Sequence, residues 1–403
     1  FIETNNFKRK AVEHFKAREY QEAIDYLRFS LDLTPDDPET RIYLHNAMIN
    51  NRKNDIAEPL VIAVSVPIKT TQTVAQEILR GVAQAQVKWN EPLTACLEKN
   101  IGCKESGTPL QVMIASDDNK SDIARNIAHY LVNHDKNVLA VVGHNASNAS
   151  TAAIERYQGQ MVMVSPTSFA LNHDEIKKSS RNKENFVYTM AHPIRDLMKN
   201  IVNEMKRQAD GKEIRILFCY DSKADDQKIA RNHFLRVVQE EPTITMYLDP
   251  KEVEKKKKGE DGKEKCDFSA PDKDILTNAK NDNVTHLFLA PHVNTVADAI
   301  LMAKQNADGP KFKLFSSPTL FTADTLLFEK DYMKDLVMAV YWYSDANETH
   351  PFYADAKGLW GTDGNLNITW RTALAYDAAT LITKGLKKLL DEENPSLTRK
   401  ALQ

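Results

Sequence analysis

Short apolar runs alternate with longer amphipathic stretches from residue 59 onward. The runs are strand-sized and mostly apolar throughout, which is typical of parallel strands covered on both faces. They predict strands at residues 60–66, 110–115, 138–142, 161–164, 214–220, 284–290, 312–315 and 336–340. The amphipathic stretches predict helices, among them residues 73–89, 121–132, 196–207 and 295–305. This sustained alternation predicts an α/β fold with two doubly wound lobes.

The first fifty residues have a helical periodicity instead. Small and apolar residues recur at helical spacing, and prolines 35 and 38 interrupt them. The recurring positions are Ala11, Phe15, Tyr20, Ala23, Ile24, Leu27, Leu31, Leu33, Ile42, Leu44, Ala47 and Met48. Their offsets resemble one tetratricopeptide helix pair followed by the first helix of another repeat. We therefore expect residues 1–55 to form a short helical extension.

A single tetratricopeptide-like repeat cannot bury both of its faces. The extension should therefore dock on the following domain, on a second chain or on residues that precede it. A protein partner held through residues 1–55 is also possible.

Charge and length narrow the function classes. The 403 residues carry 53 Lys+Arg and 56 Asp+Glu, a formal net charge of −3, which does not favour a nucleic-acid binder. No apolar run approaches the roughly 18 residues needed to span a bilayer. The sequence begins at Phe1 without a basic or apolar leader, so we expect that a signal or anchor has been removed or that the chain is trimmed.

One charged segment, residues 251–265, contains four consecutive lysines. Glutamates and an aspartate interleave with the lysines, two glycines interrupt them, and no aromatic residue is present. A solvated, mobile hairpin tip fits this composition better than a nucleic-acid patch.

Four cysteines are too few for a disulfide scaffold, and none has the spacing of a metal site. Cys96 and Cys103 are close enough in sequence to close a short loop, and either a bridge or two free thiols fits. Cys219 lies in an apolar run and is interpreted as a core residue. Cys266 follows the charged segment and has no partner nearby in sequence.

No enzyme motif is recognisable. The chain lacks a dinucleotide fingerprint, a Walker loop and a Gly-x-Ser-x-Gly elbow. Ser165 ends a predicted strand, but Pro166 follows it and no base can be assigned to it. Asp117 and Asp118 also end a strand and could suggest a metal, although an N-cap before the helix at Ser121 would explain one of them. We predict no catalytic residue, no cofactor and no bound metal.

Hydroxyl and amide side chains gather where two neighbouring predicted strands give way to helices. They are residues 143–147 after one strand and residues 165–168 after the next. In open α/β sheets, ligands bind outside the carboxyl ends of the strands. A helix N-terminus there offers free N–H groups and a positive dipole end, which suit a carboxylate. Ser147 and Ser168 could simply cap helices, but two such ends in adjacent crossovers favour a binding site.

These segments resemble the type I periplasmic binding proteins of the branched-chain amino-acid and amide uptake class. The likeness covers residues 59–403, and the order and spacing of the segments across both lobes carry it. The helical extension and the stretch at 79–86 look most like cyanobacterial members. The matching segments are residues 62–67, 79–86, 115–119, 141–144 with Ser147, 163–168, 267–269 and 373–379.

The resemblance implies two αβα lobes that hold a ligand between them. Lobe one would comprise residues 59–189 plus 337–403, and lobe two residues 190–336. In this family, hydroxyl and small residues clamp the carboxylate of an amino acid. These positions fall on Ser147 and Thr167, with Ser168 as a further candidate.

The second lobe departs from the family pattern. An aromatic position at the end of a strand falls on His292. The acidic residue that would bind the ligand ammonium falls near Pro318 and is missing. Asp225 lies near a family tyrosine position; it could replace the lost acid, or it could be a solvated aspartate at a helix start. We therefore expect a small carboxylated or amide ligand rather than leucine specifically.

The implied function is that of an extracytoplasmic solute-binding protein, periplasmic or membrane-anchored, that closes on a small ligand and delivers it to ABC permease subunits. A ligand-sensing receptor that signals through the helical extension is an alternative, and a hydrolase on the same fold is another. An exported protein also favours the Cys96–Cys103 bridge.

Overall fold

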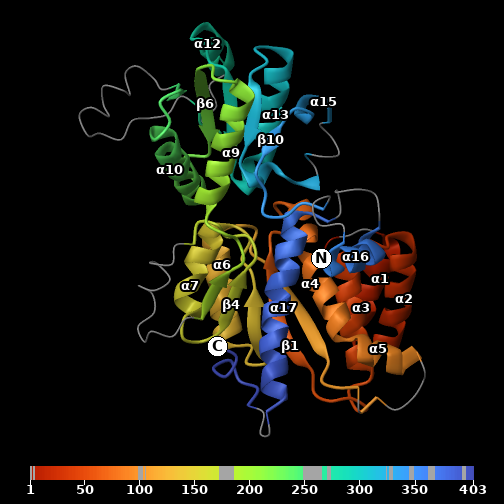
Figure 1. Ribbon diagram of the computed structural model, residues 1–403. Coiled ribbons are helices and arrows are strands. Elements are labelled where there is room, and N and C mark those ends of the chain that lie inside the picture. The colour runs from red at the N-terminus through yellow and green to blue at the C-terminus, as the bar shows by residue number, and fades with distance from the viewer. Residues whose placement is uncertain are drawn as a thin grey trace. The chain divides into compact units, whose positions relative to one another are not determined.

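A computed structural model describes residues 2, 5–98, 103–104, 106–171, 186–247, 266–269, 274–323, 325, 330–344, 349–361, 368–392 and 396–403. The chain divides into two compact units (Figure 1). The first comprises Phe1–Ala191 and Trp342–Gln403, and the second His192–Tyr341. The N-terminal helices belong to the first unit. The hairpin tip expected at residues 251–265 lies outside the described residues.

The first unit is built on a parallel five-stranded sheet in the order β2-β1-β3-β4-β5. Four of its strands lie where the apolar runs predicted them, and the fifth, β5, is too short for the pattern to indicate. The strands are β1 (Leu60–Val66), β2 (Leu110–Ser116), β3 (Val138–Val142), β4 (Val162–Ser165) and β5 (Val187–Thr189). β3 is buried at every position, as expected for a strand covered on both faces.

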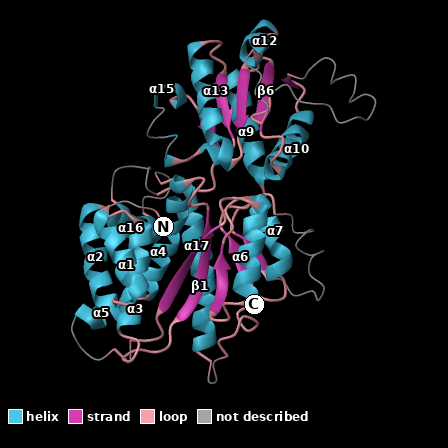
Figure 2. Ribbon diagram, turned by 180° about the vertical axis from the view of Figure 1, so that it is seen from behind, coloured by secondary structure: helices cyan, strands magenta, loops and turns pink. Residues whose placement is uncertain are grey.

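Helices lie on both faces of this sheet (Figure 2). Helices α6 and α7 pack together on one face, where Ile154 joins Val141 and Met163 in one hydrophobic cluster. Helices α4 and α17 pack against each other and against β1, β3 and β4 from the other face. The helices that follow β1 in this unit are α4 (Gln72–Trp89), α5 (Glu91–Glu98), α6 (Ser121–Asn133), α7 (Ser147–Tyr157), α16 (Pro351–Trp360) and α17 (Trp370–Leu390).

A glycine allows α4 and α17 to approach closely. A Cβ atom on Gly81 of α4 would lie 2.3 Å from the Thr372 carbonyl oxygen and 2.5 Å from the Tyr376 amide nitrogen of α17. Neither backbone atom can move without displacing the helix. The buried ion pair of Glu77 with Arg371, at 3.1 Å, links the same two helices. The contact of α4 with α17 therefore joins a segment near residue 80 to one near residue 375.

Three helices precede the first strand, and they dock on the sheet that follows them. They are α1 (Asn6–Ala17), α2 (Tyr20–Leu33) and α3 (Pro38–Asn51). Ala11, Ala23, Leu27 and Ala47 form their common core. Of the three docking alternatives, the first is confirmed for α3, which packs on α4 and β2. The tetratricopeptide resemblance itself stays a prediction.

Two asparagines occupy the outer edge of β2, where a sixth strand would otherwise pair. The Asn46 amide of α3 donates to the Val112 carbonyl at 2.8 Å and accepts from its N–H at 3.2 Å. Asn90 does the same for Leu110, at 2.9 and 2.8 Å. Alternate residues of a strand direct their backbone groups to the same side, so the two amides satisfy the first half of this edge, at Leu110 and Val112. An exposed edge strand would invite pairing with another chain.

A buried charge cluster joins α1 to the start of α3. The Lys8 ammonium, fully buried, lies 2.8 Å from Asp37 and 2.9 Å from Glu39. Burial alone would raise the pKa of the Asp37 carboxyl, but the Lys8 ammonium and the hydrogen bonds from Thr40 outweigh it, so this pKa lies below its usual value. The Ile2 N–H also donates to Glu39. The cluster fixes the start of the chain onto α3.

The second unit has its own parallel five-stranded sheet, in the order β10-β9-β8-β6-β7. Its strands are β6 (Ile214–Tyr220), β7 (Ile244–Met246), β8 (His286–Ala290), β9 (Lys313–Ser316) and β10 (Val337–Met338). Its helices are α9 (Ile194–Ala209), α10 (Asp225–Gln239), α12 (Ile275–Asn281), η1 (Val293–Thr295), α13 (Val296–Asp308), η2 (Pro318–Leu320) and α15 (Lys330–Met333). β10 pairs with β9, so this unit extends beyond residue 336, where the sequence placed the end of lobe two.

All four cysteines are paired. The Cys96–Cys103 bridge, which the cysteine spacing left open, is present. Cys219 and Cys266 form a second bridge, across 47 residues. Cys219 is buried in the core as expected, and its partner Cys266 is distant in sequence, so the sequence did not indicate this bridge. A parallel bridge between Tyr220 and Asp267 lays this segment beside β6, which brings the two sulfurs together. No helix among the described residues has the length and apolarity to cross a bilayer.

Replacing Gly81 by Ala should destabilise the protein, by about 1–3 kcal/mol, because the added methyl group overpacks a helix contact made by backbone atoms. Gly358 in α16 is the matched control, since a Cβ atom there meets nothing within 4 Å. Gly358→Ala should stabilise the protein by up to about 1 kcal/mol through helix propensity. Urea unfolding of both variants measures the difference. Equal effects of the two substitutions would refute the close contact.

Candidate functional site

The three hydroxyl residues predicted for ligand binding lie together at the carboxyl ends of β3 and β4. Ser147 is the first residue of α7, and Thr167 and Ser168 follow β4 directly. All three are buried. Ser147 does not cap its helix: the N-cap residue is Ala146, and the Ser147 hydroxyl accepts from the Ala170 N–H at 3.3 Å. Residues 172–185, where a helix after Ser168 was expected, lie outside the described part of the chain.

The turn at His144 and Asn145 holds Thr167 and Ser168 in place. The Thr167 hydroxyl donates to the Asn145 carbonyl at 2.7 Å. The Ser168 hydroxyl lies 2.6 Å from that of Ser150 and 3.2 Å from the His144 carbonyl oxygen. The ends of β3 and β4 are therefore joined through side-chain hydroxyls.

Beneath this turn lies a fully buried pair of Asp117 and His144, whose Nδ1 is 2.6 Å from the carboxylate. The carboxylate also accepts from the Ser65 hydroxyl and from the Asn119 N–H, each at 2.9 Å. Burial alone would raise the pKa of the Asp117 carboxyl, but the His144 imidazole and the other donors outweigh it, so this pKa lies below its usual value. The pair connects the ends of β2 and β3.

Gly143 allows this arrangement. Its φ angle is 139°, which L-residues rarely adopt, and a Cβ atom there would lie 2.9 Å from the Ser65 carbonyl oxygen of β1. The chain therefore turns closely against β1 and carries His144 over Asp117.

The sequence interpretation of Asp117 and Asp118 needs correction. Neither caps α6, whose N-cap residue is Lys120. Asp118 instead accepts from the Lys69 N–H at 3.1 Å and from the Ser116 hydroxyl at 2.6 Å. Among the described residues, no group of three or more His, Cys, Asp or Glu side chains could hold a metal.

Asparagines, which the sequence did not single out, extend the site. The Asn145 amide donates to the Asn119 side-chain oxygen at 3.0 Å, and Asn148 donates to the Asn119 carbonyl at 3.2 Å. Asn119 in turn donates to the Thr71 hydroxyl, just before α4, at 3.3 Å. The buried Asn148 Oδ1 has no hydrogen-bonding partner in the described part of the chain. The Ser and Asn enrichment at the start of α7 was the available signal.

The chemistry of this edge suits binding. The first N–H groups of α7 have no partner within their helix, and Ser147 and Thr167 add hydroxyls beside them. The remaining nitrogen of His144 faces the Tyr157 hydroxyl at 3.4 Å rather than a serine. The Asp117–His144 pair is therefore in contact with a buried tyrosine hydroxyl on its other side.

The candidate residues of the second unit lie at the carboxyl ends of β6 and β8. His292 follows β8 and is buried, and its Nδ1 accepts from the Asn294 N–H at 3.2 Å. Asp225 is the first residue of α10; its side chain is 77% exposed and pairs with Lys228 at 2.9 Å. The next residue, Asp226, is the buried acid of this helix start. Consecutive helical residues point about 100° apart, so only one of the two aspartates can face the sheet.

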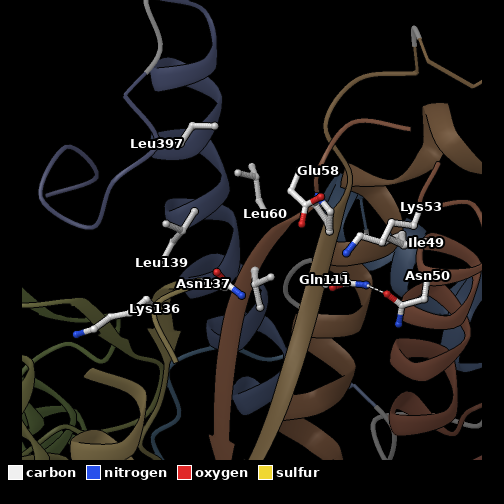
Figure 3. A pocket seen from close by; sticks show the side chains of 12 residues that line it. Ile49, Asn50, Lys53, Glu58, Leu60, Gln111, Lys136, Asn137, Leu139 and Leu397 are labelled. Carbon is white, nitrogen blue, oxygen red and sulfur yellow. Dashed lines mark hydrogen bonds between the residues drawn. The ribbon is translucent and has the colours of Figure 1, made fainter. Parts of the chain in front are cut away.

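A cavity of about 430 Å³ lies at the opposite edge of the first sheet, where β1 and β3 begin (Figure 3). Two of its polar side chains are already bonded: Gln111 donates to Asn50 at 2.8 Å, and Lys136 donates to the Val132 carbonyl at 2.7 Å. Ligands of open α/β sheets bind at the carboxyl ends of the strands instead. The chemistry therefore favours the Ser147 edge as the candidate site over this cavity. The cavity is lined by Ile49, Asn50, Lys53, Glu58, Pro59, Leu60, Val61, Gln111, Lys136, Asn137, Leu139 and Leu397.

The sequence matches no family model and no curated protein. The structure, however, is similar to those of several solute-binding proteins. A leucine-binding protein, LivK, from Thermotoga maritima matches with a TM-score of 0.62 at 16% identity, over 85% of each chain. A solute-binding protein of an ABC transporter from Rhodopseudomonas palustris, in complex with 3,4-dihydroxybenzoic acid, matches with a TM-score of 0.60 at 14% identity, over 86% of this chain and 84% of that one.

The branched-chain amino-acid transporter substrate-binding protein LivJ from Streptococcus pneumoniae, in complex with isoleucine, matches with a TM-score of 0.59 at 14% identity, over 86% of this chain and 88% of that one. These neighbours are binding proteins, not enzymes. With its two parallel sheets flanked by helices, the chain has the type I periplasmic binding protein fold.

Proposed function

We propose that this chain is an extracytoplasmic solute-binding protein that captures a small amino-acid-like or amide ligand and delivers it to an ABC transporter. The observation that carries the proposal is the polar edge at the ends of β3 and β4, where Ser147 and Thr167 lie beside the free N–H groups of α7. Structural neighbours that bind leucine, isoleucine or a benzoic acid support it.

In this proposal the edge of the first unit binds the ligand's carboxylate. The Ser147 hydroxyl and backbone N–H donors satisfy its oxygens, and the dipole of α7 favours its negative charge. The Thr167 hydroxyl joins them by exchanging its bond to the Asn145 carbonyl for one to the ligand. Ser168 supports the turn through its bonds to Ser150 and to the His144 carbonyl, and it can donate to the ligand only by giving up the latter. The Asp117–His144 pair is a positioning element, because it fixes the turn without facing the ligand itself.

The second unit offers further candidate residues, which follow β6 and β8. The proposed function is binding without a chemical step, and we assign no enzymatic activity.

A ligand-sensing receptor is the second candidate function. The observation that favours it is the docking of α3, whose Asn46 bonds to β2 and to Gln86 of α4. A partner of the N-terminal helices would thus contact an integral part of the first unit. Neighbouring genes for permease subunits would favour transport, and their replacement by a signalling protein would favour the receptor.

A few members of a panel of amino acids, amides and small carboxylates should raise the melting temperature of the protein without being consumed. A ligand at 100 times its Kd stabilises the native state by about 2.7 kcal/mol. Differential scanning fluorimetry measures the shift, and NMR of the recovered ligand checks for turnover. Conversion of a stabilising ligand would contradict the binding function.

The double variant Ser147→Ala/Thr167→Val should weaken binding of the best ligand by about 10- to 100-fold or more, since each bond to a charged group contributes about 1.5–3 kcal/mol. Isothermal titration calorimetry measures Kd. The matched control is Thr94→Val/Ser106→Ala, which removes two hydroxyls of the same unit that bond to the backbone carbonyls of Asn90 and Cys103. Equal Kd values for the two double variants would sink the site assignment.

Replacing Asp117 by Asn should destabilise the protein near pH 7 by about 1–3 kcal/mol, because it removes a buried hydrogen-bonded charge. The pKa of this carboxyl is lower in the folded state than its ordinary value of 3.8. The contribution of this carboxyl to the free energy of unfolding is therefore complete above pH 4–5, and it is lost as the pH falls through the folded pKa. The difference in free energy of unfolding between wild type and variant should therefore be smaller at about pH 3 than at pH 7. A difference in the free energy of unfolding that does not change with pH would contradict an ionised Asp117 carboxylate.

A further inference from the structure

Three buried polar residues follow neighbouring strands of the second sheet. Asp226 comes after β6, His292 after β8 and Ser317 after β9, and their exposed fractions are 5%, 6% and 0%. These strands lie side by side and run parallel, so their carboxyl ends share one edge of the sheet. The His292 Nε2 and the Ser317 hydroxyl are buried without a hydrogen-bonding partner among the described residues.

The protonation of His292 follows from its backbone contact. A backbone amide can only donate, so the Asn294 N–H fixes Nδ1 as an acceptor. The proton of the neutral ring therefore lies on Nε2. This N–H is buried and lacks an acceptor within the described residues. A buried donor of this kind is satisfied when a ligand brings an oxygen to it.

Asp226 provides a complementary acceptor close to this imidazole. Its carboxyl accepts from the N–H and the side-chain amide of the adjacent Gln227, at 2.9 and 3.1 Å, which leaves acceptor capacity on both oxygens. Burial raises the pKa of the Asp226 carboxyl, and the nearby His292 opposes that rise. Among the described residues, no hydrogen bond joins the two side chains.

The chemistry of His292 and Asp226 favours one kind of ligand group over others. An aliphatic end, such as that of leucine, would leave the His292 N–H unpaired. A carboxylate would accept from His292 but would bring a negative charge to the Asp226 carboxyl and offer it no donor. A primary amide carries an acceptor oxygen and donor N–H groups side by side, and it satisfies both residues.

We propose that His292 and Asp226 select a ligand that carries a neutral primary amide. The amide oxygen accepts from the His292 Nε2–H, and an amide N–H donates to the Asp226 carboxyl. This inference rests on the proposed binding function, because it names the class of ligand that is bound.

The test compares isosteric ligands by isothermal titration calorimetry: glutamine with glutamate, asparagine with aspartate, and leucine as the aliphatic member. The wild-type protein should bind the better of the two amides about 10- to 100-fold more tightly than its acid and than leucine. Leucine would leave the buried His292 N–H unpaired, and the acid would place its charge against the Asp226 carboxyl, so both should bind more weakly.

Two variants separate recognition from folding. His292→Phe keeps a ring but removes the N–H donor. It should bring the Kd values of the amide and of leucine closer together. Asp226→Asn keeps the shape but adds a donor, and it should shift the preference from the amide toward the acid. The control is Asp308→Asn, an exposed aspartate at the end of α13, which should leave every preference unchanged. A merely structural role for Asp226 would weaken all ligands equally.

The outcomes distinguish this inference from the proposed function. Tight binding of leucine or of an acid, with preferences unmoved in His292→Phe and Asp226→Asn, overturns the amide assignment and leaves the binding function intact. A shift of preference in Asp225→Asn instead of Asp226→Asn overturns the choice of residue. Failure of every ligand to bind the wild-type protein would overturn both.

Discussion

The close approach of Gly143 to β1 is the constraint on which the candidate site depends. With no Cβ atom, this residue lets the end of β3 lie against Ser65, and His144 then reaches the Asp117 carboxylate at the end of β2. The same turn presents the His144 and Asn145 carbonyls that hold Ser168 and Thr167. Three strand ends are thus fixed by buried hydrogen bonds, and the first N–H groups of α7 stay available for a ligand.

Each unit carries polar groups of a different chemical kind. The first unit gathers hydroxyls and a helix start, which suit an anion whatever the rest of the ligand is. The second unit gathers an imidazole N–H and a carboxyl that are not hydrogen-bonded to each other. The proposed carboxylate binding and the proposed amide selection therefore rest on separate sheets, and substitutions in each unit test one of them.

The fold was largely predictable because buried parallel strands leave continuous apolar runs. β7 and β5 escaped prediction because three residues carry too little pattern. The Cys219–Cys266 bridge depends on a pairing across 47 residues, which spacing alone cannot indicate. Local sequence also could not show that Lys8, which occupies a polar position of an amphipathic helix, is buried between two carboxylates.

Within the site, chain order indicated the hydroxyls at Ser147, Thr167 and Ser168, but it could not show what supports them. Asp117 looked like a cap or a metal ligand because its partner, His144, lies on another strand. The choice between Asp225 and Asp226 depended on the rotation of α10 about its axis. These are tertiary relations, which no local pattern contains.

The most direct test of the central claim is a crystal structure of the protein purified without added ligand or with the best ligand of the panel. The account predicts electron density for a small molecule with a carboxylate oxygen within hydrogen-bonding distance of Ser147 or Thr167 and of the first N–H groups of α7. Ligand density confined to the cavity near Lys53 and Lys136, with that edge free of ligand, would contradict it.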